Sequence, residues 1–158
     1  MNRTAKSLSL LFGLGAALQF APPARAFDMI RRSLPELAQQ SQLIFIGRCE
    51  AVSCHWNADH SLILTANRFR VERVLKGTPG AEIALDELGG VVGDRAMDAG
   101  DVPHYAVGEE VLICVHHTEL GRWVTLGGGQ GRFDVVRDSH GQPWVQNDFY
   151  RQELAAMT

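Results

Sequence analysis

The residues of this chain that could do chemistry are its histidines and cysteines. The sequence has six His and three Cys, and imidazole and thiolate groups are common metal ligands. His117 follows His116, but neighbouring strand residues point to opposite faces, so this pair cannot chelate as a unit. The remaining candidates lie at the ends of predicted strands and are able to meet in the fold: Cys54, His55, His60, Cys114 and His116. The pattern permits a metal site, with solvated histidines as the alternative.

Signatures of the common enzyme classes are missing from the sequence. It contains no HExxH, G-x-S-x-G, Walker or CxxC pattern. The glycine run at 127–131 precedes the strand-like text FDVV, whereas a phosphate-binding loop opens a helix, so we expect a tight connection with positive φ angles. Asp94, Asp98 and Asp101 miss the spacing of a calcium loop. We therefore expect no enzyme, and no cofactor other than the metal considered above.

The cysteine count favours one disulfide and one free thiol. Cys49 and Cys54 have opposite parity, so on an unbroken strand they point to opposite faces and cannot pair. Cys114 is then one member, with Cys49 as its expected partner because both lie in apolar strand text. A break near Ser53 would instead allow Cys49 to join Cys54. Three buried thiols are a further alternative.

The long connection at 88–108 is the best candidate for a functional surface. It contains five glycines and the residues Arg95, His104 and Tyr105, while the loop after the first strand begins near Trp56. Long loops are often functional, and Trp, Tyr and Arg are frequent binding anchors. We predict that Trp56, Arg95, His104 and Tyr105 contact a protein or extended-chain partner. A purely architectural role, covering the end of a barrel, is the alternative.

These candidates must be positioned by a mainly β fold. Alternating or apolar runs predict strands at 43–54, 62–75, 81–86, 111–116, 122–126, 132–136 and 144–146. Val74 and Leu75 break the alternation, as a β-bulge would. Short helices are expected at 31–41, with Ser33 and Glu36 as a capping box, and at 148–157. Together these elements predict a small closed or partly open OB-like β-barrel with short N- and C-terminal helices.

The first 26 residues have the features of a secretory signal peptide. Two basic residues precede a short apolar run, and Ala24, Arg25 and Ala26 form a cleavage site. An uncleaved anchor would need about 20 apolar residues, and prolines at 22 and 23 interrupt this segment. We expect a single domain at 27–158, secreted or periplasmic, without membrane insertion after cleavage. Removal of 1–26 leaves 12 basic and 18 acidic residues, a net charge of −6. This acidic balance argues against nucleic acid as a partner.

Several short motifs resemble those of a known group. They are IGR at 46–48, VLKG at 74–77, a Gly pair at 89–90, GEEVLI at 108–113 and GGGQGRFDVV at 127–136. Over residues 33–147 the chain resembles secreted bacterial domains with a netrin-like OB barrel, an architecture shared with the tissue inhibitors of metalloproteinases. The resemblance implies a secreted metalloproteinase as a class of partner. However, the expected mature chain begins with Phe27, not with the metal-approaching Cys of the inhibitors, so their mechanism does not carry over.

Three classes of function follow from these observations. The expected one is a secreted, non-enzymatic binding module, protease-associated or inhibitor-like, because long loops on a β scaffold without a catalytic constellation fit recognition better than turnover. The second is a periplasmic metal-binding protein that uses the Cys and His residues. The third is an enzyme with an unfamiliar site.

Overall fold

A computed structural model describes residues 30–151 of the chain. Its elements, in chain order, are α1 Leu34–Gln40, β1 Leu43–Trp56, β2 Ile63–Lys76, β3 Glu82–Leu88, β4 Gly90–Val92, β5 Arg95–Met97, β6 Glu110–His117, β7 Trp123–Thr125, the 3-10 helix η1 Gly128–Gly131, β8 Arg132–Arg137 and β9 Pro143–Gln146. The signal peptide predicted at 1–26 lies outside these residues. Within the described part, no helix is long and apolar enough to cross a membrane.

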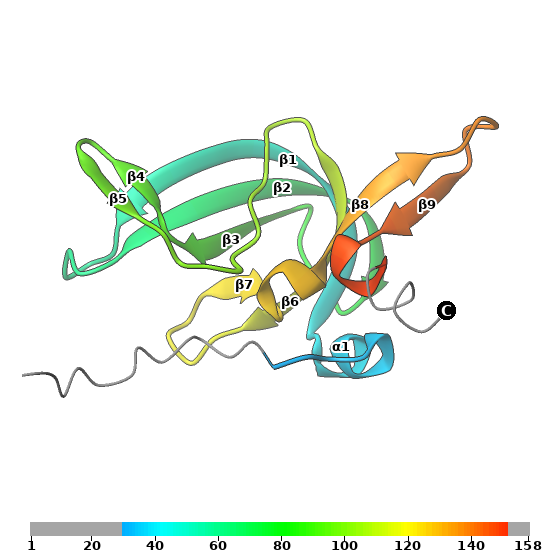
Figure 1. Ribbon diagram of the computed structural model, residues 1–158, viewed down its shortest axis with the longest axis horizontal. Helices are drawn as coiled ribbons and strands as arrows, with labels where there is room; N and C mark the ends of the chain where they lie inside the picture. Colours follow the sequence, from blue (N-terminus) through cyan, green and yellow to red (C-terminus); the bar gives the residue numbers. More distant parts are fainter. Residues whose placement is uncertain (1–29, 152–158) are drawn as a thin grey trace, which may run out of the picture.

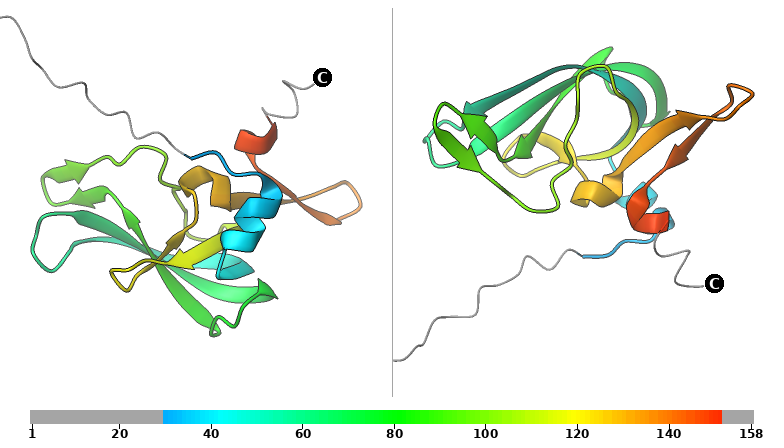
Figure 2. Two further views of the ribbon diagram at one scale, coloured as in Figure 1. Left: turned by 90° about the horizontal axis from the view of Figure 1, so that it is seen from below. Right: turned by 45° about the horizontal axis from the view of Figure 1, so that its top comes forward.

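Most strands form one antiparallel sheet that curls into a partly open barrel (Figure 1). The strand order is β3-β2-β1-β6-β8-β9, with β7 also paired to β6. Curling brings β7 next to β3, but among the described residues no backbone ladder joins these two strands. The predicted mainly β class is therefore confirmed in its partly open form. The β8–β9 hairpin projects from the barrel in every view (Figure 2).

Each predicted strand is present, and the connection at 88–108 contributes a further short hairpin, β4–β5. This hairpin packs against the ends of β1 and β2 (Figure 1). The predicted N-terminal helix is also confirmed: Ser33 caps α1, and the Glu36 side chain accepts a hydrogen bond from the Ser33 backbone N–H. The C-terminal helix begins at Asp148, and its predicted continuation beyond residue 151 lies outside the described residues.

Three bulges bend the long β1–β2 pair. The register skips Leu75, Glu72 and Glu50, and the first of these is the bulge predicted from the Val74–Leu75 pair. A bulge adds one residue to one strand and reverses the side-chain alternation beyond it. The bulge at Glu50 therefore returns Val52 and Cys54 to the concave side of the sheet. This reversal decides where Cys54 points.

Two apolar clusters lie on the two sides of β6. The barrel interior contains Phe45, Phe69, Leu85, Tyr105 and Ile113, with further residues of β1 and β6. The second cluster lies between β6 and the terminal helices and contains Leu37, Ile44, Cys114, Leu126, Phe133 and Tyr150. Alternation along β6 explains the division, because residues of odd number enter the barrel and residues of even number face the terminal helices. β6 is therefore covered by apolar side chains on both of its faces.

Candidate functional site

A cleft of about 600 Å³ opens at the gap between β3 and β7. Its walls are predominantly apolar. They come mainly from the end of β3, the β6–β7 hairpin, residues 100–103, the glycines 127 and 128 and the chain before α1. Leu88, Val102, Val124 and Leu126 supply apolar surface, and Glu87 and Arg122 are among the charged lining residues. An apolar cleft with a few converging polar groups is the usual form of a ligand site.

Glu87 closes the barrel where backbone pairing stops. Its Oε1 accepts hydrogen bonds from the Thr125 backbone N–H at 2.8 Å and from the Thr125 hydroxyl at 2.6 Å. The Thr125 hydroxyl also lies 2.7 Å from the Tyr105 hydroxyl. Glu87 is only 5% exposed, and burial raises the pKa of its carboxyl group, with the Thr125 hydrogen bonds opposing the rise. A side chain thus replaces the missing strand pairing and lines the cleft.

The glycine run forms one wall of the cleft, as a tight connection with positive φ angles rather than a phosphate-binding loop. Gly127 and Gly128 have φ angles of 71° and 58°. A Cβ on Gly128 would lie 2.2 Å from the Asp101 carbonyl oxygen, and this oxygen accepts a hydrogen bond from the Gly129 N–H at 3.0 Å. Close backbone approach therefore fixes residues 100–103 against η1.

The cleft lining also includes His116 and two arginines, Arg32 and Arg122. Burial lowers the pKa of His116, and the nearby positive charge of Arg32 adds to this effect. Within the described residues, the His116 Nδ1 atom is buried and has no hydrogen-bond partner. The Arg32 guanidinium is held by Gln40 and by the Ile30 carbonyl. The cleft therefore combines apolar walls with an imidazole whose pKa is lowered and whose Nδ1 has no partner among the described residues.

The predicted metal site is not formed. Cys54 and His55 lie near the far end of β1, whereas Cys114 pairs with Ile44 near its beginning. His116 lines the cleft, and His60 lies in the β1–β2 loop, stacked on Trp56. Within residues 30–151, no group of three or more His, Cys, Asp or Glu is placed to hold a metal ion. The two groups of candidates lie near opposite ends of the long strand β1, so the fold does not bring them together.

The predicted Cys49–Cys114 disulfide is also wrong. All three cysteines are free thiols. Cys114 pairs with Ile44, five residues from Cys49, a separation of about 16 Å along the strand, and the two thiols belong to different apolar clusters. The bulge at Glu50 places Cys54 on the same face as Cys49, contrary to the parity argument, but five residues still separate them. A disulfide needs Cα atoms within about 7 Å.

The predicted partner residues have different environments. Arg95 is well exposed, Trp56 is half-buried and His104 is exposed. Tyr105, by contrast, is a core residue, 7% exposed, with its ring edge-on to Phe69 at 4.9 Å. It was predicted as a contact residue, and the structure corrects this: its hydroxyl belongs to the Thr125 and Glu87 network. Of these four residues, none lines the cleft.

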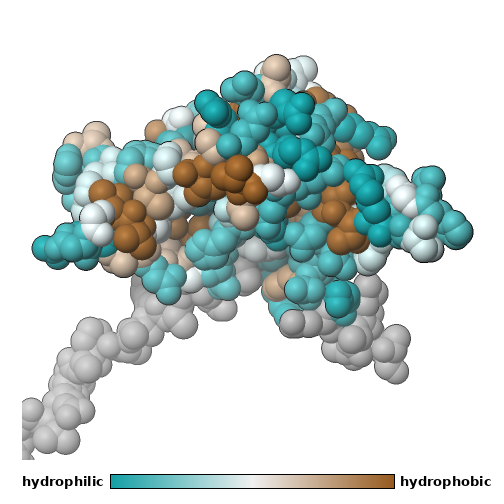
Figure 3. Space-filling model, turned by 90° about the horizontal axis from the view of Figure 1, so that it is seen from above, coloured by the Kyte–Doolittle hydropathy of each residue, from teal (hydrophilic) through white to brown (hydrophobic). Residues whose placement is uncertain are grey.

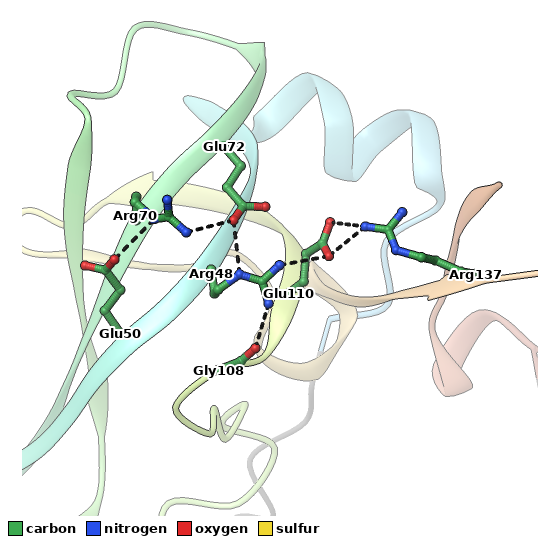
Figure 4. Close-up of polar contacts among 7 residues, drawn as sticks. All are labelled: Arg48, Glu50, Arg70, Glu72, Gly108, Glu110 and Arg137. Atoms are coloured by element: carbon green, nitrogen blue, oxygen red, sulfur yellow. Dashed lines mark hydrogen bonds and ion pairs between the residues drawn. The ribbon is translucent and has the colours of Figure 1, made fainter. Parts of the chain in front are cut away.

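An alternating ladder of ion pairs covers the outer face of the sheet (Figure 4). It consists of Arg48, Glu50, Arg70, Glu72, Glu110 and Arg137. Arg48 joins Glu72 at 3.1 Å and Glu110 at 3.2 Å, so it links three strands. Since these charges are largely matched by one another, the ladder is a stabilising surface feature, with each exposed pair contributing about 0–1 kcal/mol. It does not concentrate charge of one sign for a ligand.

Sequence reasoning missed Glu87, Asn67 and Thr125. Glu87 had a usable signal, because the alternation of Ile83 and Leu85 continues onto it and therefore points a carboxylate into the barrel. Asn67 and Thr125 had no such signal in the sequence, since their roles depend on contacts with strands distant in sequence. Comparisons with family models, curated proteins and solved structures found no match for this chain. The ligand of the cleft must therefore be argued from its own residues.

Proposed function

We propose that this protein is a secreted, non-enzymatic binding module that holds an extended segment of a partner protein in the cleft between β3 and β7. The observation that carries the proposal is the apolar cleft itself, which lies where β3 and β7 are joined by the Glu87 side chain and not by a backbone ladder. Strand edges recognise extended chains through main-chain hydrogen bonds, and neighbouring pockets select the side chains. The cleft offers the second of these features, because the Thr125 backbone N–H on the β7 edge already donates to Glu87.

The apolar walls define the kind of segment that fits. Leu88 is 39% exposed at the end of β3, and Val124 lies on β7 across the gap. Alternate side chains of an extended segment point to the same side, so one or two apolar residues spaced by two would enter the cleft. On the face in Figure 3, apolar residues form separate small patches among hydrophilic ones. A flat apolar interface on that face is therefore less well supported than a chain in the cleft.

The charge of the chain adds a kinetic expectation. The expected mature protein carries a net charge of −6, and such a field speeds association with basic partner surfaces at low salt. The resemblance to netrin-like domains adds one class of partner, a secreted metalloproteinase. A secreted zinc endopeptidase therefore belongs among the proteins tested, with residual peptidase activity as the readout.

The experiment selects binders from a displayed library of random 12-residue peptides, using residues 27–158 as bait. Dissociation constants of the selected peptides are then measured for the wild type and for Leu88→Arg, which places a charge at the cleft wall. The matched control is Leu120→Arg, at an exposed position of the β6–β7 turn that does not line the cleft. Loss of a buried apolar contact predicts binding at least about tenfold weaker for Leu88→Arg.

The control is expected to bind within about twofold of the wild type, since it removes no contact in the cleft. Both variants should melt close to the wild type, because both positions are partly exposed. A library without enriched peptides, or equal weakening by both substitutions, would contradict binding in the cleft.

A further inference from the structure

A second, smaller cavity lies on the concave side of β1, β2 and β3. It shares Glu87 and Leu88 with the cleft, but the chemistry inferred for it does not depend on peptide binding there. Its floor is set by strand register: Cys54 pairs with Thr65 and Thr65 with Glu87, while Val52 pairs with Asn67. Residues 89–91 and 102–105 cover this floor and enclose about 240 Å³. The cavity therefore combines a cysteine with the polar residues of neighbouring strands.

The polar atoms at this cavity are mainly acceptors. Asn67 is 1% exposed; its Nδ2 donates to the Thr65 carbonyl at 3.0 Å, and its Oδ1 is buried without a partner among the described residues. The Thr65 hydroxyl donates to the Gly89 carbonyl at 2.7 Å, so its remaining capacity is to accept. Glu87 adds a buried carboxylate. A buried acceptor without a donor is costly, and these atoms together favour a ligand that carries N–H donors and positive charge.

The Cys54 thiol lies at the entrance of the cavity. Its Sγ is 3.4 Å from the Thr65 hydroxyl oxygen, and a Cβ on Gly90 would approach it to 2.6 Å. Cys54 is exposed, whereas Cys49 and Cys114 are buried, and burial raises the pKa of both buried thiols. Cys54 is therefore the solvent-accessible thiol among the described residues.

We propose that Cys54 captures small amino-disulfides by thiol–disulfide exchange, with the amine held by Asn67 and Glu87 in the cavity. The Cys54 thiol first loses its proton to solvent, and the thiolate attacks one sulfur of the disulfide. The bond between the two ligand sulfurs breaks as the bond to Cys54 forms, and the second aminothiol leaves as a thiolate that takes a proton from solvent. Cys54 is oxidised and the leaving half is reduced, so the exchange needs no other oxidant.

The register places the captured amine within reach of its acceptors. Cys54 and Asn67 are diagonal neighbours on adjacent strands, whose Cα atoms lie about 7–8 Å apart, a distance that long side chains span. An aminoethyl arm attached through sulfur makes Cys54 such a long side chain. Of the residues lining the cavity, His104 alone is able to carry a positive charge, and it is exposed at the rim. The enclosed floor is thus acceptor-rich.

The test compares two disulfides of opposite charge, cystamine and 3,3′-dithiodipropionate, by following adduct formation on residues 27–158 with intact-mass spectrometry. The ratio of the two rate constants is measured for the native protein and for the same protein unfolded in urea, which corrects for intrinsic reactivity and for net charge. A nearby carboxylate and amide oxygen should make the native ratio at least about tenfold larger than the unfolded one. Peptide mapping should place the adduct on Cys54.

Variants separate the cavity from the overall charge. Glu87→Gln keeps an acceptor for Thr125 and should lower the native ratio at least about threefold, as should Asn67→Leu, which removes the free acceptor. Glu119→Gln makes the same charge change in an exposed turn and should leave the ratio unchanged. Equal ratios in native and unfolded protein, equal effects of Glu87→Gln and Glu119→Gln, or adducts on Cys49 or Cys114 of the native protein would overturn the proposal.

Discussion

Replacing Glu87 tests whether a side chain closes the barrel between β3 and β7. Glu87→Ala removes the acceptor for two donors of Thr125, which lie 2.8 and 2.6 Å from Oε1. The Thr125 hydroxyl retains Tyr105, but its backbone N–H is left unpartnered in a residue that is 4% exposed. An unpartnered buried donor costs about 1–3 kcal/mol. Glu87→Ala also removes the free-energy cost of burying the carboxyl group, which offsets part of this loss. We therefore expect a net destabilisation of about 2 kcal/mol.

The expected change in melting temperature follows from the size of the domain. A loss of about 2 kcal/mol corresponds to a fall of roughly 6–10 °C in Tm for a chain of this length. Glu87→Gln is the matched control, since its amide oxygen still accepts from Thr125 while the charge is removed. Thermal unfolding monitored by circular dichroism at several pH values measures all three proteins.

The pH dependence has a defined sign. Burial raises the pKa of Glu87 above its usual value, so the folded protein binds a proton more tightly than the unfolded chain. The stability linked to this group is fully present below the unfolded pKa of about 4.3 and is lost as pH rises through the folded pKa. Glu87→Gln should therefore gain stability relative to the wild type from pH 4 to pH 7. The barrel-closing role is refuted if Glu87→Ala melts within about 2 °C of the wild type.

Three further predictions concern other parts of the chain. Gly128→Ala should destabilise the domain by at least about 2 kcal/mol in chemical denaturation, because a Cβ there meets the Asp101 carbonyl at 2.2 Å. Gly129→Ala, with open space at its Cβ, should be nearly neutral, and equal effects of the two substitutions would contradict the tight contact. Tyr105→Phe should lower the unfolding free energy by about 1 kcal/mol through loss of a buried hydrogen bond. Trp56→Ala should destabilise the domain less than Tyr105→Ala, because Trp56 is only half-buried. The reverse order would show that Trp56 is the packing residue. The exported protein should begin at Phe27, which its intact mass checks, and recovery of residues 1–26 on a membrane-bound form would exclude cleavage.

Much of the fold could be predicted because its signals are local. Alternation within single strands located β1, β2, β3 and the later strands, and the Ser33–Glu36 pair located the start of α1. The bulge at Leu75 was visible as a break in alternation. The bulge at Glu50 was not visible in the sequence, since the polar residues around it continue the expected pattern. This bulge reversed the predicted direction of the Cys54 side chain. One additional residue in a strand changes every later side chain.

The candidate sites depended on contacts that no local pattern records. The five predicted metal ligands came from the loop after the first strand and from the end of a later strand, and the length of β1 keeps Cys54 and Cys114 apart. Tyr105 had the residue type of a binding anchor, yet its hydroxyl found Thr125 and its ring entered the core. The type of a residue indicates what it is able to do, whereas its surroundings decide what it does.

By itself the sequence determined the strands, the capped helix and the mainly β class, because backbone geometry makes each of these a property of neighbouring residues. Only the tertiary structure decided that the barrel stays open between β3 and β7, that Glu87 spans the gap, and that Cys54 shares a cavity with Asn67. Each of these depends on register between segments far apart in sequence. The register is set only when the whole sheet curls and packs, because a buried polar group is stable only where another strand supplies its hydrogen-bond partner.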